Sequence, residues 1–107
     1  MNQSLFEVIA LEGELDIERR EELARALTVT TAGPAILVDF SRVRYADSTA
    51  LAQLLKFRTN AERLGRPIAI VVGEPQFERV VQYAGLTDVF AIFHDRGEAL
   101  SYLAKQT

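Results

Sequence analysis

The stretch Asp47-Ser48-Thr49-Ala50-Leu51 lies where an apolar strand pattern gives way to a long amphipathic helical pattern. We therefore expect a hydroxyl group on the surface, where a buried strand ends and a helix begins. The first N–H groups of a helix are unpaired and carry partial positive charge, so this position suits either a hydroxyl cap or a phosphate. The hydroxyl is thus either part of the architecture or a site of phosphorylation, and the functional interpretation depends on which of the two it is.

The patterns on either side of this stretch are the clearest in the chain. A helix is expected from about Thr49 to Leu64, because apolar residues recur there at helical spacing and Gly65 and Pro67 follow as stop signals. Before it, Ala35–Phe40 is almost continuously apolar, which is typical of a strand covered on both faces. Residues 41–46 are expected to be a connection.

The rest of the chain alternates in the same way. A strand is expected over 5–11, which Gly13 ends, and a helix follows from a cap at Asp16 to about Leu27. After the long helix, a strand over Ile68–Val72 precedes a helix that Pro75 starts and Gly85 ends. The last expected elements are a strand over Val89–Phe93 and a helix capped by Asp95 that runs to about Ala104. The expected buried residues of the first helix are Ile17, Leu23, Ala24 and Leu27. Leu86 is expected to fold back on Val81 in a Schellman ending.

Alternation of strands and helices with short connections predicts an α/β fold. We expect a mixed, largely parallel sheet of about four strands with about four helices. A chain of 107 residues is long enough for one domain and too short for two ordinary ones, so residues 1–107 are interpreted as a single domain.

Composition excludes several classes of site. Cysteine is absent and His94 is the one histidine, so disulfides, thiol nucleophiles and multi-histidine metal sites are excluded. The net charge is −3 without a basic block, which argues against nucleic acid as a partner. The sequence has neither a long apolar run nor a signal-peptide pattern at its start. We therefore expect a cytoplasmic protein without direct membrane contact, cofactor or metal.

Two segments together resemble the STAS domain, and within it the bacterial anti-sigma factor antagonists. Leu11–Asp16 (LEGELD) is similar to the family's L-x-G-E-L-D, and Val38–Leu51 is similar to its strand, loop and D-S-[ST]-G-L helix start. The chain departs from the family at Ala50, which replaces a glycine and whose methyl group is expected to crowd a partner backbone. It also leaves only Met1 to about Ser4 for the family's first strand. The edge exposed by a missing strand would invite self-association, so a homodimer is expected as an option.

The resemblance implies roles for four residues. Ser48 occupies the position that a partner kinase phosphorylates, with Thr49 as the second candidate, and Asp16 and Asp47 lie in the partner-binding surface. The alternative for Ser48 is a helix N-cap, and both aspartates are equally suited to capping. Arg42 and Arg44 are interpreted as solvated charges.

The function implied by the resemblance is that of a binding protein. The unphosphorylated domain binds an anti-sigma factor of the serine-kinase type and frees the sigma factor; phosphorylation at Ser48 weakens the complex, and a phosphatase resets it. The alternatives are a scaffold subunit of a STAS signalling assembly and a STAS accessory subunit of a lipid ABC transporter. An enzyme is the least favoured reading, because the carboxylates Asp39 and Asp47 lack an accompanying nucleophile or phosphate-binding loop.

Overall fold

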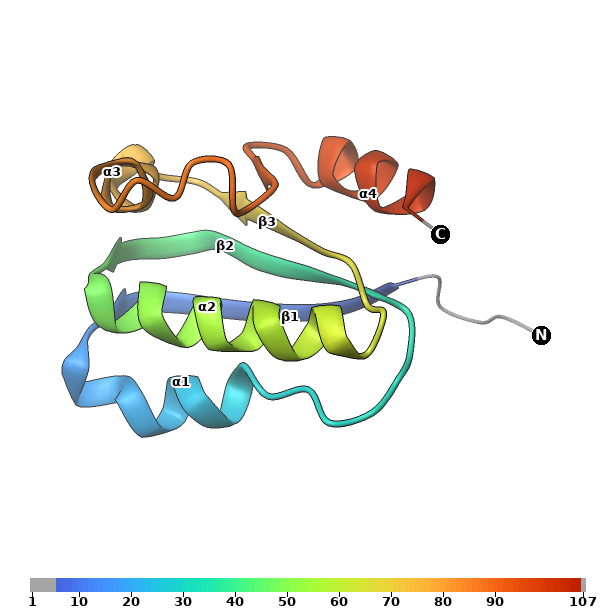
Figure 1. The fold of residues 1–107 in the computed structure, drawn as a ribbon. Helices are drawn as coiled ribbons and strands as arrows, with labels where there is room; N and C mark the ends of the chain where they lie inside the picture. Colours follow the sequence, from blue (N-terminus) through green and yellow to red (C-terminus); the bar gives the residue numbers. More distant parts are fainter. Residues whose placement is uncertain (1–5, 107) are drawn as a thin grey trace.

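The chain folds around one parallel sheet. A computed structural model describes residues 6–106, in which four strands lie in the order β1-β2-β3-β4; Figure 1 shows β1, β2 and β3 as neighbouring arrows. Their bounds are Phe6–Leu15 for β1, Ala35–Ala46 for β2, Ile68–Val72 for β3 and Ile92–Phe93 for β4. All three strand pairings are parallel. The α/β fold and the number of strands are confirmed, and within residues 6–106 the sheet is parallel throughout rather than mixed.

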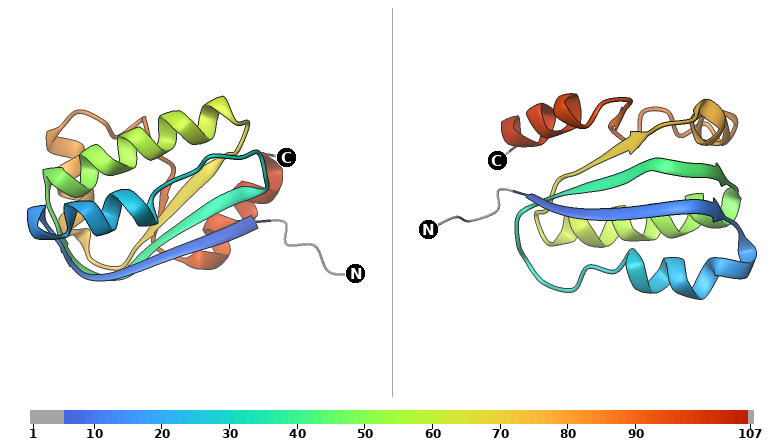
Figure 2. Two further views of the ribbon diagram at one scale, coloured as in Figure 1. Left: turned by 90° about the horizontal axis from the view of Figure 1, so that it is seen from below. Right: turned by 180° about the vertical axis from the view of Figure 1, so that it is seen from behind.

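Helices cover both faces of this sheet. They are α1 (Arg20–Ala26), which follows a 3-10 turn over Ile17–Arg19, α2 (Ser48–Arg63), α3 (Pro75–Tyr83) and α4 (Arg96–Lys105). Figure 2 shows α1, α2 and α3 on one face and α4 on the other. Every helix in the described part of the chain is too short or too polar to cross a bilayer.

The alternation of β2 side chains explains these two layers. Ile36, Val38 and Phe40 point to the face of α1, α2 and α3, where they join the larger core. Ala35 and Leu37 point to the smaller core beneath α4. A strand buried on both faces needs apolar side chains at successive positions, which is why Ala35–Phe40 lacks the usual polar alternation.

The first two strands are longer than the sequence indicated. The prediction that Gly13 ends the first strand is wrong, because β1 continues through it to Leu15. Gly13 takes a φ of 83°, which glycine adopts without strain, and the pairing with β2 shifts register around it. The prediction of a connection over 41–46 is wrong too: β2 continues to Ala46, which pairs with Leu15. In residues 41–46 only Val43 and Ala46 are buried, so the second half of β2 lacks the apolar character of the first half.

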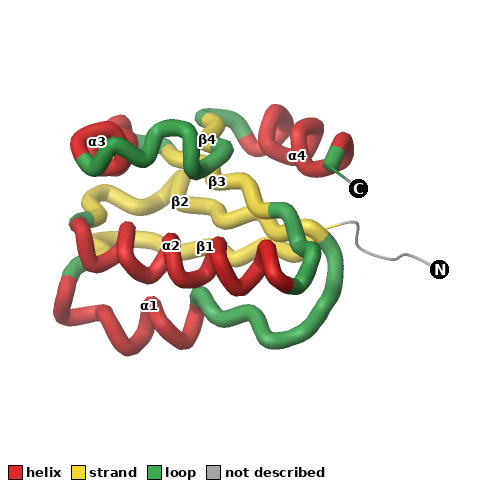
Figure 3. The backbone as a smooth tube through the Cα atoms, in the orientation of Figure 1, coloured by secondary structure: helices red, strands yellow, loops and turns green. Residues whose placement is uncertain are grey.

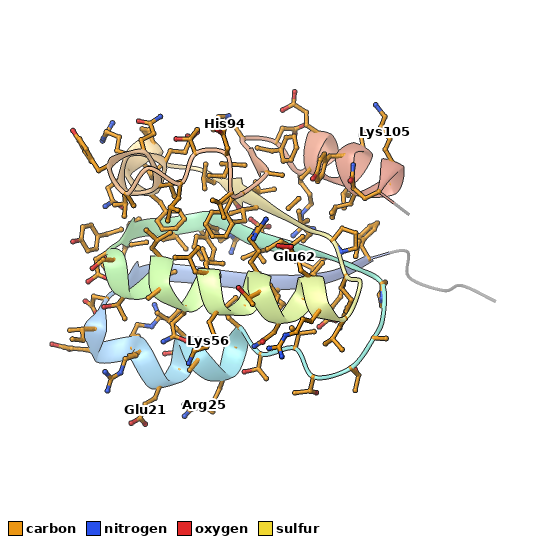
Figure 4. All side chains as sticks on the ribbon, viewed as in Figure 1. Glu21, Arg25, Lys56, Glu62, His94 and Lys105 are labelled. Atoms are coloured by element: carbon orange, nitrogen blue, oxygen red, sulfur yellow. The ribbon has the colours of Figure 1, made fainter. Side chains whose placement is uncertain are left out.

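The first helix also differs from its prediction. The chain forms a 3-10 turn after Asp16 and becomes α-helical only at Arg20. This turn rotates Ile17 off the buried stripe, so Ile17 is 66% exposed and the expectation that it is buried is wrong. Leu23 and Leu27 are buried as expected. Figure 4 shows Glu21 and Arg25 pointing away from the sheet, in agreement with a surface helix.

In the carboxyl-terminal third, the last strand is shorter than predicted, whereas the predicted end of α3 and start of α4 are confirmed. Figure 3 shows β4 as a short segment, because only Ile92–Phe93 pairs with β3 and not the whole of 89–93. The Leu86 N–H donates to the Val81 carbonyl at 3.0 Å, which confirms the Schellman ending of α3. Asp95 caps α4 as predicted. The expected short or missing strand at Met1 to Ser4 lies outside the described residues, and within residues 6–106 no strand pairs with the outer edge of β1.

Candidate functional site

The stretch from Asp47 to Leu51 begins where β1 and β2 end together. Leu15 and Ala46 are the last paired residues of the two strands, and the Asp47 N–H donates to the Leu15 carbonyl at 3.2 Å. Asp16 and Asp47 therefore follow adjacent strand ends, and the starts of α2 and of the 3-10 turn lie at the same end of the molecule (Figure 1). The fold brings together the two segments on which the sequence interpretation depends.

Asp47, and not Ser48, caps α2. Its backbone is extended, and its Oδ1 accepts a hydrogen bond from the Thr49 N–H at 2.8 Å. The helix starts at Ser48, one residue earlier than expected, so the alternative in which Ser48 is the cap is wrong. Asp16 caps the 3-10 turn in the same way, accepting from the Glu18 N–H at 3.1 Å. Both aspartates thus have a structural task, and both are half-buried.

The Ser48 side chain is left free by this arrangement. Ser48 is exposed, and its hydroxyl group makes no hydrogen bond to residues 6–106. Thr49 is half-buried, and Ala50 is fully buried in the larger core. The expectation that the Ala50 methyl group crowds a partner is therefore wrong, because that methyl group packs inside the chain. Of the two hydroxyl residues, Ser48 is the more accessible to an enzyme.

Two exposed apolar side chains lie close in sequence to the capping aspartates. Ile17 is 66% exposed and directly follows Asp16. Tyr45 is 45% exposed and lies two residues before Asp47. Sequence reasoning missed both of them, because Ile17 fitted a helical stripe and Tyr45 fell in an expected connection. Both side chains are therefore accessible to solvent, Ile17 just after β1 and Tyr45 near the end of β2.

The arginines around the site are held by acidic or carbonyl groups. Arg44 is exposed as expected, and it also forms a surface ion pair with Glu14 at 2.9 Å. Arg19 donates to the carbonyls of Glu12 and Glu14 at 2.7 and 2.9 Å, and it pairs with Glu22 at 2.7 Å. The hydrogen bond with Glu22 raises the pKa of Arg19, and in return it lowers the pKa of Glu22. Arg19 thereby fastens the 3-10 turn to the end of β1, a role that its position in a charged helix did not reveal.

Sequence reasoning also missed a residue of α3. The Gln76 side chain forms two hydrogen bonds of 2.9 Å, one with the Ala46 N–H and one with the Ala46 carbonyl. Ala46 is the residue immediately before Asp47, so a distant helix makes contact with the backbone that leads into the site. A glutamine in the first turn of a helix carries no sequence signal for such a contact.

Asp39 and Asp47, the two carboxylates considered as an acid/base pair of an enzyme, both have structural roles. Asp47 is a helix cap, while Asp39 accepts from the Ser41 N–H at 2.8 Å and from Arg96 at 2.7 Å. Burial alone would raise the pKa of Asp39, but the hydrogen bonds from Ser41 and Arg96 outweigh it and hold the pKa below its usual value. Asp39 also lines a cleft of about 320 Å³ with Glu12, Arg42 and Arg96, and neither Asp47 nor Ser48 belongs to this cleft.

Comparison with known proteins places this geometry in context. A family model described as "Mlab, STAS domain" matches residues 4–94. An anti-sigma factor antagonist from Mycobacterium paratuberculosis superposes with a TM-score of 0.82 over 97% of this chain and 90% of its own, at 23% identity. The unphosphorylated form of the anti-sigma factor antagonist SpoIIAA superposes with a TM-score of 0.64 over 92% and 87%, at 25% identity.

A third solved structure shares the fold. It is a protein of the DUF3478 family with a SpoIIAA-like fold from Shewanella loihica, which superposes with a TM-score of 0.54 over 90% of this chain and 82% of its own, at 20% identity. No curated protein sequence shows significant similarity.

Proposed function

This chain belongs to the STAS domain family, and on that premise we propose that it is an anti-sigma factor antagonist switched by phosphorylation of Ser48. In its unphosphorylated form it binds an anti-sigma factor of the serine-kinase type, which then releases its sigma factor. The likeness to two antagonists of known structure supports this class of partner. The observation that carries the choice of residue is the free, exposed hydroxyl group of Ser48 beside a helix cap that Asp47 already provides.

Phosphorylation at this position changes the surface and preserves the fold. The kinase transfers the γ-phosphoryl group of Mg-ATP: the bond from phosphorus to the Ser48 oxygen forms, the bond to ADP breaks, and a base on the kinase takes the hydroxyl proton. The product carries about −1.5 to −2 charge at neutral pH. The partial positive charge at the start of α2 favours this group, and the cap at Thr49 does not involve Ser48. The domain therefore stays folded while its binding surface gains charge and bulk.

The binding surface on this proposal surrounds Ser48 at the end of β1 and β2. Asp16, Asp47 and Thr49 contribute polar contacts, and Ile17 and Tyr45 contribute apolar area. Apolar side chains at the centre of an interface supply most of its affinity, whereas charges at its rim set orientation and association rate. A phosphate next to Asp47 adds like charge in the middle of this surface, so it weakens the complex.

Substitution of the serine tests this function directly. We expect Ser48→Asp to retain the circular dichroism spectrum and melting temperature of the wild type and to lose affinity for the anti-sigma factor by at least about tenfold, as calorimetry would measure. Ser48→Ala should bind like the wild type. Ser101→Asp is the matched control, because Ser101 is an exposed serine of α4 on the other face of the sheet.

The outcome against the proposal is equal binding by Ser48→Asp and Ser48→Ala. Purification of the tagged chain from its own cells distinguishes the alternatives. Recovery with an ABC transporter ATPase and no anti-sigma factor would support the transporter subunit, and large assemblies on size exclusion would support the scaffold.

A further inference from the structure

The second half of β2 has a neighbouring strand on one side only. On the β1 side, pairing continues to the last residues, Leu15 and Ala46. On the β3 side, pairing stops at Phe40 and Val72, because β3 ends there and the chain turns into α3. From Ser41 onward, β2 therefore extends beyond the end of β3 and, among residues 6–106, has no strand beside it on that side.

Gln76 supplies what the missing strand would give to Ala46. Its Oε1 accepts from the Ala46 N–H, and its Nε2 donates to the Ala46 carbonyl, each at 2.9 Å. A carboxamide has the same donor and acceptor as a peptide group, so the side chain pairs with Ala46 as a neighbouring strand would. Ala46 is 0% exposed, and a buried peptide group without partners is costly, so this contact is needed for the strand end to keep its position.

We propose that Gln76 is the positioning residue of the Ser48 switch, an inference that rests on the proposed function. Gln76 fixes Ala46 through its two hydrogen bonds, which we call the Gln76 clamp. Asp47 follows Ala46 as the cap of α2, and Ser48 is the next residue. The clamp therefore sets the position of the backbone that carries the Ser48 hydroxyl group. Phosphoryl transfer depends on an acceptor oxygen held in line with the phosphorus atom, and small displacements of an acceptor reduce the rate. The two hydrogen bonds thus link the first turn of α3 to the residue before the cap of α2.

The variants that test this inference differ in which hydrogen bonds remain. Gln76→Met keeps the length of the side chain and removes both bonds. Gln76→Glu keeps the acceptor for the Ala46 N–H and loses the donor to the carbonyl. Gln82→Glu is the matched control, because Gln82 is an exposed glutamine of the same helix and the change introduces the same charge.

The first measurement needs no partner. Amide hydrogen exchange, read by NMR, is expected to accelerate about tenfold or more at Ala46 in Gln76→Met and to stay unchanged at Ile70 in the centre of β3, which reports on global unfolding. Gln76→Glu, which retains the acceptor, should protect Ala46 better than Gln76→Met. Unchanged exchange at Ala46 in Gln76→Met would overturn the inference, because the backbone would then be fixed without the clamp.

The second measurement follows phosphorylation of Ser48 by a serine-kinase anti-sigma factor with Mg-ATP. We expect kcat to fall at least about tenfold in both Gln76 variants, with KM within about twofold of wild type, and both constants unchanged in Gln82→Glu. A purely structural role would leave kcat unaltered once the variants are folded, and this result would overturn the inference. If wild type itself is not phosphorylated, the proposed function fails, whereas the exchange at Ala46 still decides whether Gln76 fixes the strand end.

Discussion

At the start of α2, two neighbouring side chains have different roles. Asp47 satisfies the helix end by accepting from the Thr49 N–H, and Ser48 is exposed with its hydroxyl group unengaged. If Ser48 were the cap, phosphorylation would remove a hydrogen bond of the fold. Because the cap is an aspartate, the hydroxyl group is available for modification without loss of helix stability.

Accessibility of this oxygen can be measured by placing a thiol there. The chain contains no cysteine, so Ser48→Cys provides a single reactive thiol. We expect it to react with Ellman's reagent at close to the rate of the unfolded chain, because the site is exposed and a helix start favours the thiolate. Ala50→Cys, two residues further and fully buried, is the control and should react at least about a hundredfold more slowly. Equally slow reaction at both positions would contradict the exposure of Ser48.

The capping role of Asp47 can be separated from its proposed contact with the partner. Asparagine caps helices as well as aspartate does, so Asp47→Asn should leave the free energy of unfolding within a few tenths of a kcal/mol, whereas Asp47→Ala should lower it by about 1 kcal/mol in urea titrations. If the Asp47 carboxylate contacts the anti-sigma factor, Asp47→Asn will weaken binding despite its normal stability. Normal binding by Asp47→Asn would assign Asp47 to capping alone.

At the scale of elements, the turn between β3 and α3 determines how closely α3 approaches β2. A Cβ atom added to Gly73 would overlap the Ser41 carbonyl oxygen, a backbone atom that cannot turn aside. Glycine at this position therefore allows the chain leaving β3 to pass close to β2, and three residues later Gln76 reaches Ala46. The turn and the clamp belong to one local arrangement.

This close approach predicts a large effect from a small substitution. Gly73→Ala should destabilise the fold by about 1–3 kcal/mol in urea unfolding, since either strand must shift to make room for the methyl group. Amide exchange at Ala46 should accelerate at the same time, because the shift moves α3 away from β2. Glu74→Ala, at the exposed next position, serves as the control and should change stability by less than about 0.5 kcal/mol. A Gly73→Ala protein as stable as the control would contradict the packing described.

Elements with a strong local signal were predicted from the sequence. The helix after Asp47 has a regular apolar stripe, and β3 is a short apolar run between breakers. The end of α3 at Gly85 and the start of α4 at Asp95 follow from local chemistry. The fold class followed from their alternation.

The errors arose where distant contacts decide the structure. Pairing between β1 and β2 carries both strands past Gly13 and Ser41, although neither stretch is apolar enough to indicate a strand by itself. Exposure of Ile17 and the Gln76 contact to Ala46 depend equally on tertiary arrangement. The position of Ser48 at the surface was predictable, whereas the side chains that surround and fix it were not.

For the whole molecule, two ion pairs that include a buried charged residue, Arg66 or Asp39, do not involve the start of α2. Arg66 is 6% exposed and joins β1 to the loop before β2, through Glu7 at 2.6 Å and the Pro34 carbonyl at 2.8 Å. Asp39 and Arg96 join β2 to α4 on the opposite face from α2. Changes at Ser48 are therefore expected to leave these connections intact.

The ion pair at Asp39 predicts how global stability depends on pH. Because its pKa is lower in the folded than in the unfolded chain, Asp39 contributes stability above its unfolded pKa, near 4, and loses it as the pH falls through the folded value. Asp39→Asn should be less stable than wild type at pH 7, and the difference should shrink between about pH 5 and pH 2 in thermal unfolding. Asp88→Asn, at an exposed aspartate, is the control expected to follow the wild-type curve. A constant difference at every pH would show that ionisation of Asp39 does not contribute.

The most direct test of the central claim is to map the phosphate and follow the complex together. The chain is incubated with its serine-kinase anti-sigma factor and Mg-ATP, sites are identified by mass spectrometry, and the complex is sized before and after reaction, with Ser48→Ala alongside. We predict one phosphate, on Ser48, accompanied by dissociation of the complex, and neither event in Ser48→Ala. Phosphate on Thr49 alone, no phosphate at all, or a phosphorylated chain that remains fully bound would contradict the account.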